Sequence, residues 1–159
     1  MLKVQYKENA NDPTISAISD RGRIVALDPG TKRVGVAVSD DLRLIATPKP
    51  AIPRRSWKKL LQEVETVIAK FDAVALVIGL PLNTDGSESS MSAEARNMAA
   101  KFQASVNIPV FLEDERVTSY EARKRLWDRG VSLDETKKFI DSEAAAIILT
   151  DFLERLSNS

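Results

Sequence analysis

Residues 23–40 read RIVALDPGTKRVGVAVSD, two apolar segments joined by a short turn. Residues 23–28 are apolar for most of their length and residues 33–39 are rich in valine, which is typical of buried strands. The intervening residues 29–32 open with the pair Pro-Gly, a turn signal. So short a connection predicts an antiparallel hairpin, and the first strand of that hairpin ends on a carboxylate, Asp28.

The rest of the chain alternates helices and strands. A third strand is expected at 42–47, ended by Pro48 and Pro50. Apolar periodicity and apolar runs predict helices at 56–71, 92–104, 119–129 and 141–156, and strands at 73–78 and 108–112. Early hairpins and later helical crossovers predict an α/β fold, with a mixed five-stranded sheet and helices on both faces.

Length and composition are those of one globular domain. The chain has 159 residues, of which 43% are hydrophobic and 29% charged, so it can form a core. Residues 1–22 lack sustained periodicity, and we expect a flexible N-terminal arm before a domain at 23–156. No apolar run approaches the ~20 residues that span a bilayer, and the N-terminus lacks the apolar core of a signal peptide. We therefore expect a cytoplasmic protein without a membrane partner.

The sequence contains no histidine and no cysteine. This excludes Ser-His-Asp and Cys-His nucleophile systems, histidine acid–base pairs and the usual zinc sites. The groups left for catalysis are carboxylates, amines, guanidinium groups, hydroxyls and a hard cation, and oxygen ligands select Mg²⁺ or Mn²⁺. The formal net charge is zero, so a nucleic-acid-binding surface would depend on how the charges are distributed.

Acidic residues lie at the ends of several predicted strands. Asp28 ends a central strand, next to the usual ligand site of an α/β sheet, although Asp-Pro-Gly is also a good turn by itself. Asp114 and Glu115 come just past the strand at 108–112. Strand alternation sends these two side chains to opposite faces, so at most one of them points where Asp28 points. Their alternative role is to cap the helix that follows.

Asp141 opens the last predicted helix. It shares one helical face with Ala145, Ile148 and Phe152, so its carboxylate belongs to the core-facing side. An acid there is costly unless it is paired or binds a metal; the alternative is an ordinary N-cap aspartate. Converging carboxylates, in a chain without histidine or cysteine, indicate a divalent-metal site at which water could attack a phosphodiester.

Basic residues cluster in two parts of the chain. They are Arg54, Arg55, Lys58 and Lys59 at the first predicted helix, and Arg116, Arg123, Lys124, Arg125 and Arg129 after Glu115. Such runs either contact phosphates or form a solvated helix face. Arg116 adjoins the acids and could orient a carboxylate or a scissile phosphate. We predict nucleic-acid contacts for Lys32, Arg33, Arg116 and Arg123.

Four segments of the chain together resemble the YqgF/RuvX family of Holliday-junction-resolvase-like pre-16S rRNA nucleases. They are ALDPGTKRVGVAVSD (26–40), VIGLPLNTDGS (77–87), VFLEDERVTSYEA (110–122) and DSEAAAIILTDFL (141–153), in the family's order. The resemblance implies an RNase H-like fold and maturation of the 5′ end of 16S rRNA in the cytoplasm. It also implies that Asp28, an acid of the DER motif and Asp141 bind the metal ions, and Glu115 is favoured over Asp114 as the DER ligand.

The resemblance departs from related junction resolvases at one position. Those proteins carry a glutamate after the fourth strand, where this sequence has Gly79-Leu80-Pro81, so the DER acid must substitute for it. The resulting prediction is a metal-dependent phosphodiester hydrolase that acts on structured nucleic acid, pre-rRNA in particular. Its catalytic candidates are Asp28, Asp114, Glu115 and Asp141.

Three other interpretations remain open. A junction resolvase acting on DNA would be a dimer, because two symmetric cuts need two sites; the sequence itself leaves both monomer and homodimer open. A nucleic-acid-binding assembly factor without catalysis would gain little from gathering like charges. Residues 28–40 also resemble the phosphate loop of actin-like ATPases and sugar kinases, but one short domain without a second phosphate loop argues against ATP binding.

Overall fold

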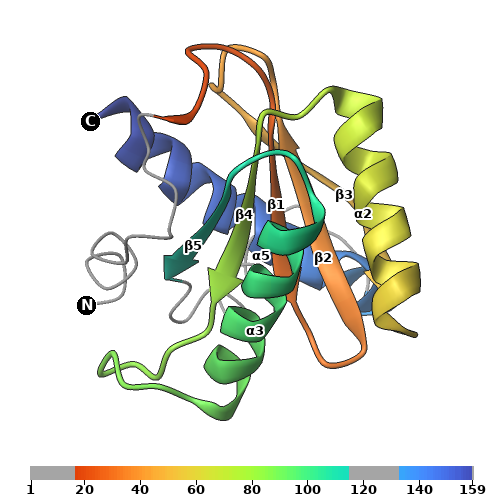
Figure 1. The fold of residues 1–159 in the computed structure, drawn as a ribbon. Coiled ribbons are helices and arrows are strands. Elements are labelled where there is room, and N and C mark those ends of the chain that lie inside the picture. Colours follow the sequence, from red (N-terminus) through yellow and green to blue (C-terminus); the bar gives the residue numbers. More distant parts are fainter. Residues whose placement is uncertain (1–16, 115–132, 159) are drawn as a thin grey trace.

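A five-stranded mixed sheet organises residues 17–114 and 133–158, the part of the chain that the computed structural model describes (Figure 1). The strands lie in the order β3-β2-β1-β4-β5; β1–β2 and β2–β3 are antiparallel, and β1–β4 and β4–β5 are parallel. This confirms the predicted hairpin and mixed sheet. The elements are β1 (Ile24–Pro29), β2 (Arg33–Ser39), β3 (Ala46–Pro53), α2 (Trp57–Phe71), β4 (Ala75–Leu80), α3 (Ser90–Ser105), β5 (Val110–Asp114) and α5 (Leu133–Ser157).

Helices cover both faces of the sheet: Figure 1 shows α3 in front of the strands and α5 behind them. Alternation along β1 divides the core in two. Val25 and Leu27 belong to the cluster under α2 and α3, whereas Ile24 and Ala26 belong to the cluster under α5. Because side chains alternate along a strand, Asp28 follows Ala26 onto the α5 face.

The helices α2 and α3 form close to where the apolar spacing predicts them. The hydroxyl of Ser56 caps α2 by accepting a hydrogen bond from the Lys59 N–H at 3.2 Å. Ser89 and Ser92 form a reciprocal capping box at the start of α3. The predicted inward residues of α3 are all buried, namely Ala95, Met98, Ala99 and Phe102.

The third strand differs from the prediction, which placed it at 42–47 and ended it at the prolines. β3 instead begins at Ala46 and continues through Pro48 and Pro50. It lies at the edge of the sheet, where a proline removes no hydrogen bond from a second neighbouring strand. The connection before it, not a strand, carries the exposed side chains of Leu42 and Leu44.

The last helix begins earlier than predicted, at Leu133 instead of Asp141. Residues 133–140 contain neither glycine nor proline, so nothing in them stops a helix from extending toward the N-terminus. The N-cap alternative for Asp141 is therefore wrong, because this residue lies inside α5. The predicted core-facing stripe is confirmed where side chains are described: Ala145, Ile148 and Phe152 are fully buried.

The described part of the predicted N-terminal arm contacts the domain. Ile18 is buried in the core cluster on the α5 side, and the Arg43 guanidinium donates to the carbonyl oxygens of Ser19 and Gly22. Residues 1–16 and the helix predicted at 119–129 lie outside the described residues. None of the helices within 17–114 and 133–158 has the length and apolar character that crossing a membrane requires.

Candidate active site

The carboxyl ends of three parallel strands meet at one edge of the sheet. Leu27 of β1 is level with Ile78 of β4, which is level with Leu112 of β5. The next residue of β1 is Asp28, the last but one of that strand, which is only 8% exposed. As the sequence predicts, Asp28 therefore stands at the tip of a central strand, the place where open α/β sheets bind ligands.

Glycines flank Asp28 on both neighbouring strands. Gly35 of β2 is its antiparallel partner, and Gly79 follows Ile78 at the same level of β4. Neither neighbour therefore has a side chain beside the carboxylate. At the position where the sequence comparison with related resolvases predicts a glutamate, this chain has Gly79, which is buried in the middle of the edge.

The helix α5 reaches the same edge through Ser142. This residue is fully buried, and its hydroxyl accepts a hydrogen bond from the Val36 N–H at 3.2 Å. Val36 adjoins Gly35, and the β2–β3 register shifts between Val34 and Val36, as at the bulges that often accompany active sites. The backbone of Asp141, which precedes Ser142 in α5, is thereby fixed beside the strand pair that carries Asp28.

A second buried acid shares the face of Asp28 and was not predicted. Glu113 of β5 is level with Gly79, so it lies two strand spacings, about 10 Å, from Asp28. Its Oε1 accepts from Nε and Nη2 of Arg155 in α5, at 3.1 and 2.6 Å. The sequence signal was available, because Phe111 and Glu113 have the same strand parity. Glu113 ties β5 to α5 and so supports the site.

Of the other predicted acids, only Asp114 has a side chain within the described residues. Val110 and Leu112 belong to the core under α2 and α3, so alternation directs Asp114, the last residue of β5, to the face opposite Asp28. Glu115 lies outside the described residues, and only the backbone of Asp141 is described. Another acid that the sequence analysis did not select, Glu143, is 2% exposed in α5.

The described side chains, those of residues 17–114 and 142–158, contain no group of three acids that could hold a metal ion. Asp28 by itself fits a hard cation, because it offers carboxylate oxygens at the carboxyl edge of the sheet. The other two ligands predicted from the sequence, Glu115 and Asp141, have side chains outside the described part of the chain.

The hairpin after Asp28 is tied to the start of α2. The Arg54 guanidinium donates to the Gly30 carbonyl at 2.9 Å and forms an ion pair with Glu94. The Arg54 N–H donates to the Lys32 carbonyl, also at 2.9 Å. Lys32 itself is exposed and Arg33 is half-buried. Of the other predicted nucleic-acid contacts, Arg116 and Arg123 lie outside the described residues.

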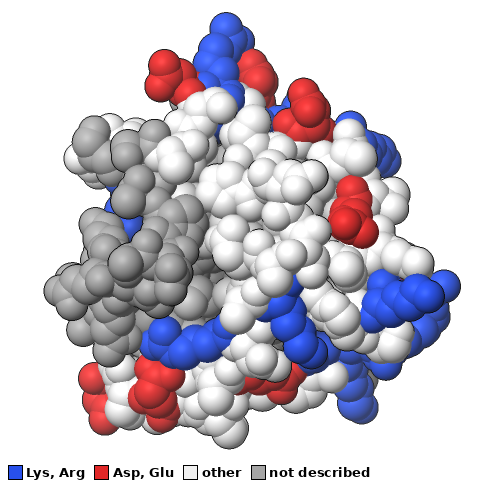
Figure 2. Space-filling model, in the orientation of Figure 1, with Lys and Arg blue, Asp and Glu red and all other residues white. Residues whose placement is uncertain are grey.

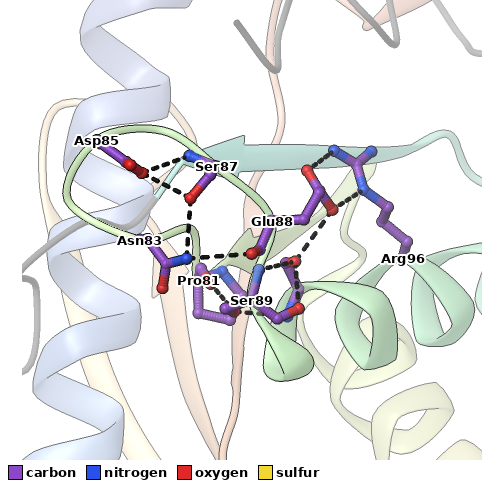
Figure 3. A network of polar contacts seen from close by, with 8 residues as sticks. Pro81, Asn83, Asp85, Ser87, Glu88, Ser89 and Arg96 are labelled. Carbon is purple, nitrogen blue, oxygen red and sulfur yellow. Dashed lines mark hydrogen bonds and ion pairs between the residues drawn. The ribbon is translucent and has the colours of Figure 1, made fainter.

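The loop that follows β4 at this edge is held by its own hydrogen bonds (Figure 3). Asp85 Oδ1 accepts from the backbone N–H and the hydroxyl of Ser87, at 2.9 and 2.6 Å. Asn83 Nδ2 donates to the Ser87 hydroxyl and to the Glu88 carbonyl. The hydroxyl of Ser89 donates to the Pro81 carbonyl at 2.5 Å. These contacts give the loop after β4 a defined shape close to Gly79.

An ion pair fastens the same loop to α3. Nε and Nη2 of Arg96 donate to the two carboxylate oxygens of Glu88 at 3.0 and 2.9 Å (Figure 3). These bonds hold the pKa of the Glu88 carboxyl below its usual value. Glu88 therefore remains ionised at neutral pH and keeps the loop connected to the helix.

Comparison with known proteins identifies a family and two groups of similar proteins. A family model described as RuvX, Holliday junction resolvase, matches residues 22–155. A protein of Anaeromyxobacter sp. (strain K) named "Putative pre-16S rRNA nuclease" is 38% identical over 133 residues, which cover 84% of this chain and 97% of that protein. A Klebsiella pneumoniae protein of the same name is 34% identical over 134 residues, 84% of this chain and 97% of that protein.

Solved structures of resolvases share the fold. Thermus thermophilus RuvC, in complex with a Holliday junction substrate, aligns with a TM-score of 0.55 at 16% identity, over 87% of this chain and 97% of that chain. The fowlpox virus Holliday junction resolvase aligns with a TM-score of 0.51 at 13% identity, over 84% and 99% of the two chains. These similarities confirm the predicted RNase H-like α/β fold.

Proposed function

The chain belongs to the RuvX family, and from that premise we propose that it is an endonuclease that cleaves precursor 16S rRNA at the 5′ end, in the cytoplasm. The observation that carries the proposal is Asp28, a buried carboxylate at the carboxyl edge of the sheet, between glycines on both sides. The relatives of this chain that are named "Putative pre-16S rRNA nuclease" support RNA as the proposed substrate. The nuclease domain is proposed to be residues 23–156, with residues 1–22 as an arm.

Asp28, Glu115 and Asp141 are the proposed ligands of Mg²⁺ or Mn²⁺. Asp28 lies on the α5 face, and the Ser142–Val36 bond holds the backbone next to position 141 near it. The period of two that places Phe111 and Glu113 against α5 predicts the same face for Glu115. A bound ion supplies Lewis acidity at the scissile phosphate. The carboxylates hold it there, and the buried Glu113–Arg155 pair keeps β5 and α5 in place around them.

Positive charge beside this edge supports binding of a polyanion. Lys32 and Arg33 lie in the hairpin that follows Asp28, and Arg116 and Arg123 follow the DER acid in sequence. We propose that these four residues contact phosphates and position the backbone of the nucleic acid. Lys32 is exposed on the turn, so its side chain can reach a phosphate without disturbing the sheet.

The test is cleavage of a labelled pre-16S 5′-leader RNA with Mg²⁺ or Mn²⁺. Asp28→Asn should abolish cleavage without unfolding the protein, because the amide has nearly the same shape but weaker affinity for a cation. Asp114→Asn is the matched control, since alternation directs that acid to the opposite face, and it should cleave like wild type. Equal cleavage by wild type and Asp28→Asn would refute the site.

A junction resolvase acting on DNA is the second candidate, favoured by the description of the family. Parallel reactions with a four-way DNA junction separate the two substrates. A resolvase should cut the junction symmetrically as a homodimer. If the protein cleaves the leader RNA and sediments as a monomer, the resolvase candidate is excluded. Binding of both nucleic acids without any cleavage would favour a non-catalytic assembly factor.

A further inference from the structure

The helices α2 and α3, with the residues just before α2, line a partly open cavity of about 210 Å³ that the proposed nuclease chemistry does not use. We name it the α2–α3 cavity. The residues of its wall on which the inference depends are Arg54, Arg55, Trp57, Glu94 and Lys101. Its volume is below the ~300–1,000 Å³ of pockets for drug-sized ligands, so it suits one small planar group.

An aromatic ring forms one wall of the cavity. Trp57 is half-buried, and its ring meets the ring of Phe102 edge-on, with centroids 4.8 Å apart at 64°. The Lys101 ammonium lies 5.1 Å from the Trp57 ring centroid. An indole ring that lines a cavity and has the exposed side chain of a lysine over it can exchange that cation for a stacked base.

The charge around the cavity favours a phosphate. Arg55 and Lys101 are exposed beside it, and the acid in its wall, Glu94, forms an ion pair with Arg54. The first turn of α2 contains no acidic residue. No carboxylate in that turn therefore offsets the positive end of the helix dipole, which favours binding of an anion. In Figure 2 blue side chains gather over the end of the molecule at which α2 begins.

The cavity is connected to the active-site edge by one residue. Arg54 lines the cavity and donates to the Gly30 carbonyl at 2.9 Å. Gly30 lies two residues after Asp28, which is about 7 Å along an extended chain. The Asp28 carboxylate lies on the α5 face of the sheet and the cavity lies on the α2–α3 face, so a strand of nucleic acid bound at Asp28 has to pass over the turn that contains Gly30 to place one of its nucleotides at the cavity.

We propose that the α2–α3 cavity binds one unpaired nucleotide of a single-stranded segment, with its base against Trp57 and its phosphate at Arg55 and Lys101. The inference rests on the proposed function in one respect, because it takes the bound nucleotide to be part of the substrate of the nuclease. A base within a duplex has its faces covered by neighbouring bases, so the cavity selects substrates with a single-stranded segment beside the cut.

The experiment measures binding in EDTA, so that its result does not depend on cleavage. Trp57 and Trp127 are the two tryptophans, and Trp127→Phe leaves Trp57 as the reporter. A short single-stranded RNA should quench Trp57 fluorescence, and the blunt duplex of the same sequence should not. In the unmodified background, Trp57→Leu should weaken anisotropy-detected binding of the single strand by about 5- to 150-fold, the range for loss of one stacked base.

Salt dependence of binding tests the two proposed phosphate contacts, Lys101 and Arg55, with Lys70 as a matched control. Lys101→Ala and Arg55→Ala should each lower the slope of log affinity against log salt by about 0.7, the value for one phosphate contact on a single strand. Lys70→Ala removes an equally exposed cation, one that lies over the Phe71 ring at the other end of α2, and should leave that slope unchanged.

Two outcomes would overturn the proposal. One is equal quenching of Trp57 by single strand and duplex; the other is a Lys70→Ala effect as large as that of Lys101→Ala. If the leader RNA is not cleaved but quenches Trp57 as described, the proposed function fails and the cavity remains a nucleotide site. If cleavage occurs without quenching, only the cavity proposal fails.

Discussion

Replacing Ser142 by alanine removes the hydrogen bond that joins α5 to the bulged strand β2. The Ser142 hydroxyl accepts from the Val36 N–H at 3.2 Å, and the Ser142 side chain is fully buried. Alanine fits the same space in a helix, so the change creates no overlap. It does leave a buried backbone N–H without its acceptor.

The expected loss follows from that unpaired donor. A buried group left without its partner costs about 1–3 kcal/mol in the free energy of unfolding. For a chain of this size each kcal/mol corresponds to roughly 2–4 °C in Tm, so Tm should fall by about 2–12 °C. The rate of RNA cleavage should fall as well, because the backbone next to Asp141 loses its attachment to β2, the strand that pairs with Asp28.

Urea unfolding followed by circular dichroism measures the loss. Thr150→Ala is the control on the same helix: its hydroxyl donates to the Ala146 carbonyl at 2.8 Å, but the residue is exposed. Its effect should stay within about 0.5 kcal/mol. If Ser142→Ala also stayed within that range and cleaved like wild type, α5 would not be held by this bond.

Three further predictions address other contacts of the described residues. Glu113→Gln should lower the free energy of unfolding by about 1–3 kcal/mol in urea, because Arg155 keeps its buried charge and loses the opposite one. Acidification below the ordinary Glu88 pKa of 4.5 should loosen the loop after β4: the pKa is lowered in the fold, so the stabilisation is present at neutral pH and lost as pH falls through the folded value. Amide exchange in the loop reports this, and Glu88→Gln should remove the pH dependence. Gly22→Ala should cost about 1–3 kcal/mol in Tm-derived stability, since Gly22 has φ +117° and a Cβ there would lie 2.6 Å from Val74; an unchanged Tm would contradict this.

Local patterns predicted the elements whose signals are local. The hairpin at β1–β2 follows from two apolar runs and one turn, and α2 follows from an apolar stripe. The errors occurred where tertiary context decides. Pro48 and Pro50 end a strand only if it is central, and their edge position is a property of the whole sheet. The start of α5 at Leu133 precedes the apolar stripe from which it was predicted.

The candidate site was predictable as a set of residues but not as a geometry. Asp28 at a strand tip is visible from sequence, whereas its position between Gly35 and Gly79 requires the register of three strands. Glu113 was missed for a similar reason. Its strand parity with Phe111 indicates the face on which it lies, but its partner Arg155 is 42 positions away in sequence, so the ion pair that accompanies its burial could not be predicted locally.

Stability and activity are coupled in this fold because one helix serves both. The helix α5 is attached to the sheet at Ser142, through Val36, and at Arg155, through Glu113. These positions are 13 residues apart, or about 20 Å of helix, and the side chains between them fill the core on that face. A change that shifts α5 on the sheet therefore also shifts position 141 relative to Asp28. Since a displacement of ~1 Å can cost a hundredfold in rate, substitutions under α5 should reduce cleavage before they unfold the protein.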